Sequence, residues 1–85
     1  MFRYTAKKLA RDIDRAVRDL DPSLHSRYEP SANEVQIFRG DDDTASYKIF
    51  LGNLLLKVAA LPRKDRRPSI DTFLREALQP KELSA

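Results

Sequence analysis

The stretch LGNLLLKVAALPRKDRR, from Leu51 to Arg67, changes from an apolar segment into a strongly basic one around a single proline. At helical spacing most of its apolar side chains fall within an arc about 160° wide, typical of a helix with one buried face. The members of this arc are Leu51, Leu54, Leu55, Val58, Ala59 and Leu61. The pattern predicts a helix from about Asn53 that Pro62 ends. Leu56 lies about 60° outside the arc, so it either covers a neighbouring element or is presented to a partner.

The residues after Pro62 predict a basic loop and then a second helix. The loop carries Arg63, Lys64, Arg66 and Arg67. Ser69 is the predicted N-cap, and Asp71 suits the first helical turn. Apolar positions then recur at helical spacing, at Ile70, Phe73, Leu74, Ala77 and Leu78. Pro80 is predicted to end this helix and to leave residues 80–85 as a tail.

The N-terminal segment predicts an amphipathic helix from Ala6 to about Leu20. Thr5 is a suitable N-cap, and the sequence DPS at residues 21–23 ends the pattern. One arc about 120° wide holds the apolar residues of this segment, which are Ala6, Leu9, Ala10, Ile13, Ala16, Val17 and Leu20. A helix with such a stripe requires another element to pack against.

Between these helices the apolar residues alternate, which predicts β-strands. We expect strands at residues 24–29, 34–39 and 44–50, separated by the turn sequences PSAN and GDDD. They would form a three-stranded antiparallel meander with one face against the first helix. Phe38 and Phe50 point to the opposite face under strict alternation, which implies a bulge, a partly covered second face or an exposed aromatic patch.

Together these elements predict an α+β fold: a helix, a three-stranded antiparallel meander and two helices, with the helices mainly on one face of the sheet. The 85 residues contain no cysteine and have the size of one domain with a thin core. We expect a single domain over residues 1–85, ordered from about 4 to 79. The longest mostly apolar run, residues 49–61, is too short for a bilayer, which needs about 20 residues. The charged N-terminus does not resemble a signal peptide, and we expect a cytoplasmic protein.

The residue types that usually carry catalysis or bind metals are scarce. One histidine and no cysteine exclude the common zinc constellations and a cysteine nucleophile. His25 falls in the first strand without the spacing of a triad, and residues 41–43 lack the spacing of a calcium loop. The two glycines form no phosphate-binding loop. We therefore expect neither enzymatic activity nor a bound metal or cofactor.

The leading hypothesis is a protein–protein interaction module, an accessory, assembly or inhibitory protein that binds another protein or a second copy of itself. It depends on apolar side chains without an evident place in the core, which mark an interface when they are exposed together. The expected partner-binding residues are Phe38, Phe50, Leu56, Arg63, Lys64, Arg66 and Arg67, with Phe2 and Tyr4 as further apolar candidates. The basic loop would orient the partner, because residues 46–68 hold six basic and one acidic side chain, a net +5.

The alternative hypothesis is nucleic-acid binding through a basic stripe on the first helix together with the loop at residues 63–67. The stripe consists of Lys7, Lys8, Arg11, Arg15 and Arg18. Helix, three strands, helix is also the order of the double-stranded-RNA-binding domain. That family concentrates lysines at the start of the helix after the sheet, where this chain reads LGNLLLKV. Asp12, Asp14 and Asp19 also dilute the charge of the first helix.

Two further resemblances concern the layout of the chain. The segments KKLARDI, EVQIF…ASYKIFLGNLLLK and SIDTFLREAL resemble the N-terminal segment of an uncharacterised bacterial domain-of-unknown-function family, over residues 4–78. This resemblance implies the same fold but no activity and no site residues. A helix followed by three strands is also similar to the layout of secretion chaperones, which would imply dimerisation through the following helix. Those chaperones are typically longer and acidic, whereas this chain is basic.

Overall fold

The N-terminal helix forms as its sequence predicts. The computed structural model describes residues 3–82, with side chains as far as Leu78. Helix α1 spans Ala6–Leu20, and the Thr5 hydroxyl caps it by accepting a hydrogen bond from the Lys8 N–H at 3.2 Å. The middle of the predicted apolar stripe is buried, from Leu9 to Val17, so this face packs against the rest of the fold.

The predicted antiparallel meander is also present. Strands β1 (Leu24–Glu29), β2 (Glu34–Arg39) and β3 (Tyr47–Phe50) form one sheet in that order. A short 3-10 helix, η1 (Pro30–Ala32), and Asn33 with a φ of 52° turn the chain between β1 and β2. The fold class predicted from the sequence, α+β with a three-stranded antiparallel sheet, is confirmed.

Strand β3 is shorter than the predicted segment 44–50. The Ser46 N–H and the Ser46 hydroxyl both donate to the Ile37 carbonyl, at 2.8 and 3.2 Å. Since Tyr47 is the residue opposite Ile37 in the ladder, two residues of one strand face one residue of the other. This irregular pairing ends the ladder, and residues 40–46 form the loop between β2 and β3.

The second half of the chain corrects part of the prediction. Helix α2 spans Gly52–Ala59, and helix α3 spans Arg63–Glu82. The basic residues after Pro62 are therefore the first turns of α3 rather than a loop, and Ser69 lies inside this helix rather than at its N-cap. Pro68, the sixth residue of this helix, has no N–H to donate to the carbonyl of Lys64, four residues earlier. Lys64 is an exposed residue near the start of the helix. The helix also continues past Pro80 to Glu82, so the predicted end at Pro80 is wrong.

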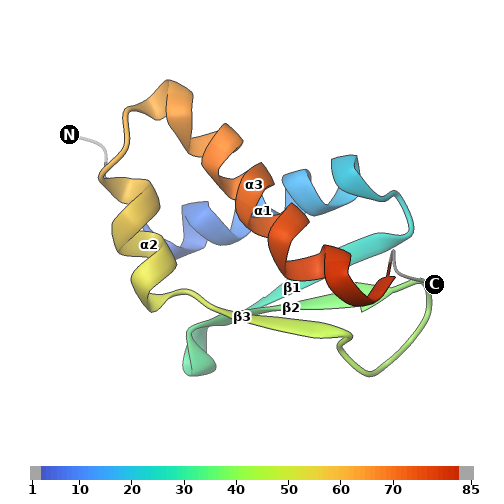
Figure 1. Cartoon of the computed structure of the whole chain (residues 1–85). Helices are drawn as coiled ribbons and strands as arrows, with labels where there is room; N and C mark the ends of the chain where they lie inside the picture. The colour runs from blue at the N-terminus through green and yellow to red at the C-terminus, as the bar shows by residue number, and fades with distance from the viewer. Residues whose placement is uncertain (1–2, 83–85) are drawn as a thin grey trace.

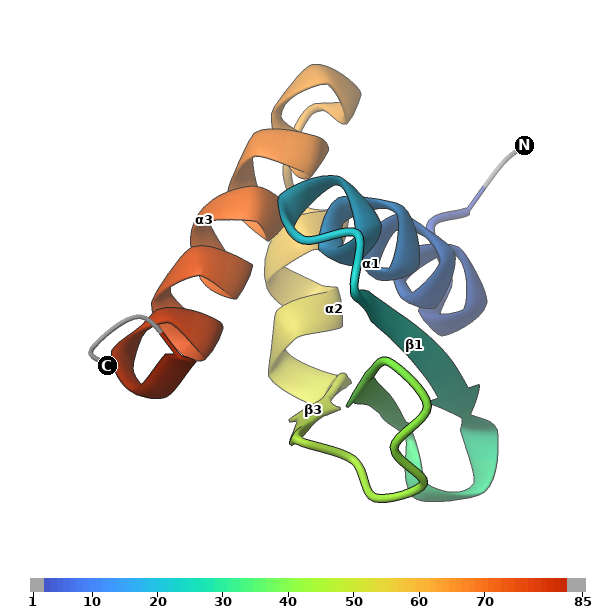
Figure 2. The same cartoon turned by 90° about the vertical axis from the view of Figure 1, so that its right-hand side faces the viewer.

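Helices α1, α2 and α3 lie on one side of the sheet, and none of them covers the opposite face (Figures 1 and 2). Helix α1 crosses the sheet, α3 packs beside α1, and α2 connects the end of β3 to α3. This is the predicted arrangement.

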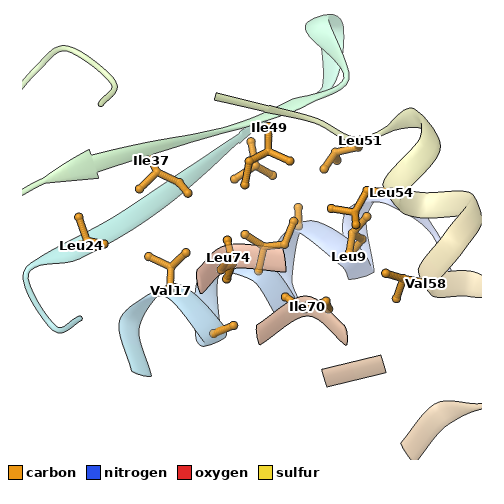
Figure 3. Packing of buried hydrophobic residues seen from close by; sticks show 14 residues of the cluster. Leu9, Val17, Leu24, Ile37, Ile49, Leu51, Leu54, Val58, Ile70 and Leu74 are labelled. Carbon is orange, nitrogen blue, oxygen red and sulfur yellow. The ribbon is translucent and has the colours of Figure 1, made fainter. Parts of the chain in front are cut away.

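One hydrophobic core joins all of these elements. Figure 3 shows Ile70 and Leu74 of α3 within the same core cluster as Val17 of α1 and Ile37 of β2. The fully buried large side chains of this core are Leu9, Ile13, Val17, Val35, Ile37, Leu51, Val58, Ile70 and Leu74. Most of the apolar arc of α2 belongs to it as well, through Leu51, Leu54 and Val58 and through the partly buried Leu55.

Candidate binding surfaces

An exposed apolar surface lies where β3 continues into α2. The Phe50 side chain points away from the core and is 67% exposed, and Leu56 is 72% exposed. The Phe50 ring lies over Gly52, because a Cβ atom at Gly52 would stand only 2.7 Å from the ring carbon Cε2. Gly52 and Leu56 are four residues apart in α2 and therefore share a helix face. Phe50 and Leu56 therefore lie on the same side of the junction between β3 and α2, and we call these two residues the Phe50–Leu56 patch.

Phe38 does not belong to this patch. It is 6% exposed although it lies on the sheet face opposite the helices. The His25 ring stacks against it with centroids 5.5 Å apart, and the Arg27 guanidinium lies 5.3 Å from its centroid. Of the three alternatives raised by the sequence, a partly covered second face applies to Phe38. Glu34, the residue opposite Phe50, is four positions from Phe38 on β2, about 13 Å along the strand.

Arg66 is engaged inside the fold. Its guanidinium donates to the carbonyls of Leu61 and Ala59, at 3.2 and 3.4 Å, and so caps the end of α2. It also lies 4.5 Å from the centroid of the Tyr4 ring, a cation–π contact. Arg66 and Tyr4, both expected from the sequence to bind a partner, thus contact each other within the fold. Phe2 lies outside the described residues.

Arg67 joins the ends of two helices. It donates to Asp19 of α1 at 2.6 Å and to Asp71 of α3 at 2.9 Å. These two hydrogen bonds raise the pKa of Arg67 further above its ordinary value. The basic segment is therefore divided: Arg66 and Arg67 hold the helices together, whereas Arg63 and Lys64 are exposed.

The basic stripe on α1 is clearer than its sequence implies. Lys7, Arg11 and Arg15 are exposed at intervals of four residues, so they line one face of the helix. Lys8 is half-buried, and Arg18 forms an ion pair with Asp14 at 2.9 Å.

The three acidic residues of α1 are all hydrogen-bonded within the fold. The Tyr4 hydroxyl donates to Asp12 at 2.7 Å, and Asp19 accepts from Arg67. The Ser26 N–H and hydroxyl donate to Asp14 at 3.1 and 2.8 Å, which ties α1 to β1. Asp14 and Asp19 are paired with the cations Arg18 and Arg67, whereas Asp12 bonds to a neutral hydroxyl and keeps its negative charge beside the stripe.

The shifted pKa values in α1 and before it reflect these contacts. Burial and the hydrogen bond to Asp12 raise the pKa of Tyr4 well above its ordinary value. Burial alone would raise the pKa of Asp14, but the hydrogen bonds from Ser26 and Arg18 outweigh it and hold the pKa below 3.8. At neutral pH the Tyr4 hydroxyl therefore stays protonated and donates, and the Asp14 carboxyl stays ionised and accepts.

Other features of the described residues are small. An open pocket of about 170 Å³ lies between α1 and α3, and the paired groups Asp19, Arg67 and Asp71 line it. Within residues 3–82 no three His, Asp or Glu side chains converge in a way that could hold a metal ion. No helix in the same range combines the length and the apolar character that a bilayer crossing requires.

Searches for similar proteins gave no further information. Neither a protein-family model, nor a curated protein, nor a solved structure matches this chain.

Proposed function

We propose that this chain is a small non-enzymatic module that binds a protein partner through the Phe50–Leu56 patch. The observation that carries the proposal is the exposure of two large apolar side chains at the junction of β3 and α2. Complete burial of a leucine or phenylalanine side chain stabilises by roughly 1.5–3 kcal/mol. A partner that covers both would therefore gain a substantial part of its binding energy from two residues, as interface hot spots do.

Two of the four basic residues that the sequence predicted to orient a partner are exposed beside this surface's helix. Only Arg63 and Lys64 of the basic segment are exposed, and they begin α3 directly after α2. We assign them an orienting role toward acidic groups of the partner, because exposed charges affect association rates more than affinity.

Leu56→Asp tests this proposal. A carboxylate in place of Leu56 should abolish association with the partner and leave the fold intact, since the side chain is 72% exposed. The matched control is Asn53→Asp, which adds the same charge to an exposed position of α2. Native mass would be measured for the purified proteins and for complexes recovered from the host, with circular dichroism as the test of folding. Association that survives Leu56→Asp unchanged would contradict the proposal.

A second candidate function is nucleic-acid binding through Lys7, Arg11 and Arg15. The observation that favours it is the internal pairing of Asp12, Asp14 and Asp19, which leaves this row of cations on one face. On duplex DNA the logarithm of the affinity should then fall with the logarithm of salt concentration, by about 0.9 per neutralised phosphate. Arg11→Glu should remove the binding, whereas Lys57→Glu on α2 should not. An absence of retardation of duplex and single strands at low salt would exclude this function.

A further inference from the structure

The two edges of the sheet differ in how their backbone groups are used. The edge strand β1 directs the backbone groups of Leu24, Ser26 and Tyr28 outward, because Gly40 donates to the Ser23 carbonyl and fixes the alternation. Two of these three outward N–H groups already have acceptors. Leu24 donates to the Asp21 carbonyl at 2.9 Å, and Ser26 donates to the Asp14 carboxylate. The β1 edge is therefore largely closed to another strand.

The β3 edge is open. The Leu51 N–H donates to the Asn33 carbonyl at 2.9 Å, and in an antiparallel ladder every second residue on β3 then bonds to β2. Ile49 and Tyr47 are these residues, so Lys48 and Phe50 direct their N–H and C=O groups away from the sheet. No described residue accepts a hydrogen bond from the Lys48 or Phe50 N–H, although the C-terminal turns of α3 lie beyond β3 on the helix side of the sheet (Figure 2). An edge of this kind is a template for strand pairing.

We propose that β3 pairs with β3 of a second copy of this chain, antiparallel and about a two-fold axis at Ile49. The inference rests on the proposed function, since it names the partner of the surface that contains Phe50. In this register Lys48 of one copy faces Phe50 of the other, and the reverse pair forms on the other side of the axis. All the outward N–H and C=O groups of Lys48 and Phe50 are then paired, and the two sheets become one continuous sheet.

The lysine selects this register among those that symmetry allows. An axis at Lys48 would place the two Lys48 ammonium groups directly opposite each other, which is unfavourable for like charges. An axis at Phe50 would pair β3 with the start of α2, which is not a strand. With the axis at Ile49, each ammonium group lies beside an aromatic ring, an arrangement that favours cation–π contact.

A second copy suits this edge better than an unrelated extended segment. Strand β3 has four residues, so strand pairing alone buries much less than the area of about 1,000 Å² expected of a stable interface. A two-fold axis brings both Phe50–Leu56 patches to the same interface and adds apolar area on each side of the shared strands. A single added peptide strand would bring no second Phe50–Leu56 patch and would therefore bury less apolar area.

Backbone hydrogen exchange of the purified chain tests this inference. With increasing protein concentration, exchange of the Lys48 and Phe50 amides should slow at least tenfold as the mass rises from monomer to dimer. The amide of Ile49, which bonds to β2, should be protected at every concentration. Slow exchange at these two positions identifies the β3 edge directly.

Lys48→Pro provides the matched variant. Proline removes an N–H that β2 does not use, and edge strands tolerate it at such positions. It should abolish the dimer, whereas Lys48→Ala, which keeps the N–H, should retain it. A monomer at all concentrations with rapid exchange at Lys48 and Phe50 would overturn the inference, yet loss of another partner with Leu56→Asp would still support the proposed function. A dimer whose Lys48 and Phe50 amides remain unprotected would also overturn strand pairing.

Discussion

At the scale of single residues, Asp14 contributes most clearly to the connection between helix and sheet. It accepts three hydrogen bonds, two from Ser26 of β1 and one from Arg18 on its own helix. Asp14→Ala should therefore lower the free energy of unfolding by about 1–2 kcal/mol, as expected for charge-assisted hydrogen bonds at a partly exposed site. Urea denaturation at neutral pH measures this effect, with Asp41→Ala in the exposed β2–β3 loop as the control. Equal stability of the two variants would contradict the assignment.

The contribution of Asp14 should depend on pH in a defined direction. Because its pKa is lower in the folded chain than the ordinary 3.8, the stabilisation is fully present above the unfolded pKa. It is lost as the pH falls through the lower folded pKa. The stability difference between the parent chain and Asp14→Ala should accordingly shrink below about pH 4, and a difference that grows there would contradict this account.

Sequence patterns predict burial at the residue scale better than they predict polar contacts. Leu56 lies outside the apolar arc in the sequence pattern and is exposed in the structure. Helical periodicity is enough to identify such a residue, because it determines which side chains share a face. The pairing of Arg67 with Asp19 joins residues 48 positions apart, and no local pattern reports such a contact. Phe38 is covered by His25 and Arg27 of the neighbouring strand whereas Phe50 is exposed, and the alternation along a single strand does not distinguish the two.

At the scale of elements, Arg66 determines how α2 ends and how the chain before α1 is held. It contacts the carbonyl of Ala59, the last residue of α2, the carbonyl of Leu61 just after this helix, and the Tyr4 ring. Arg66→Ala should lower the free energy of unfolding by about 1–2 kcal/mol, because it removes two cap hydrogen bonds and one cation–π contact.

Arg63→Ala is the control for this prediction, since Arg63 begins the same helix but is exposed. Thermal or urea unfolding provides the comparison. Arg66→Lys should recover only part of the loss, because a single ammonium group does not reproduce the planar fork of the guanidinium. Full recovery with lysine would show that charge alone accounts for the contact.

Element boundaries were predictable where local signals agree. The bounds of α1, β1 and β2 follow from the Thr5 cap, the alternation of apolar residues and the PSAN turn. The start of α3 was missed because Pro62, Pro68 and Ser69 are all typical helix boundaries. Burial of Ile70 and Leu74 against α1 and the sheet, together with the contacts of Arg66 and Arg67, fixes the first turns as helix despite these signals.

At the scale of the whole molecule, the order of elements was enough to predict the fold but not the two candidate surfaces. The alternation and the three amphipathic patterns require a sheet covered by helices on one face. Whether the α1 stripe is diluted, and which edge of the sheet is open, depends on side chains such as Asp14 that approach from distant parts of the chain. These contacts become visible only once the helices are packed.

The carboxylate of Asp14 also has a consequence for how far the sheet can grow. In the proposed dimer the β3 edges are paired with each other, and the β1 edge of each chain is largely occupied by Asp14 and Asp21. Loss of the Asp14 carboxylate would release the Ser26 N–H, whereas the Leu24 N–H would still donate to the Asp21 carbonyl and α1 would still pack against β1. One acidic side chain on a helix thereby occupies part of a sheet edge that could otherwise template the addition of another strand.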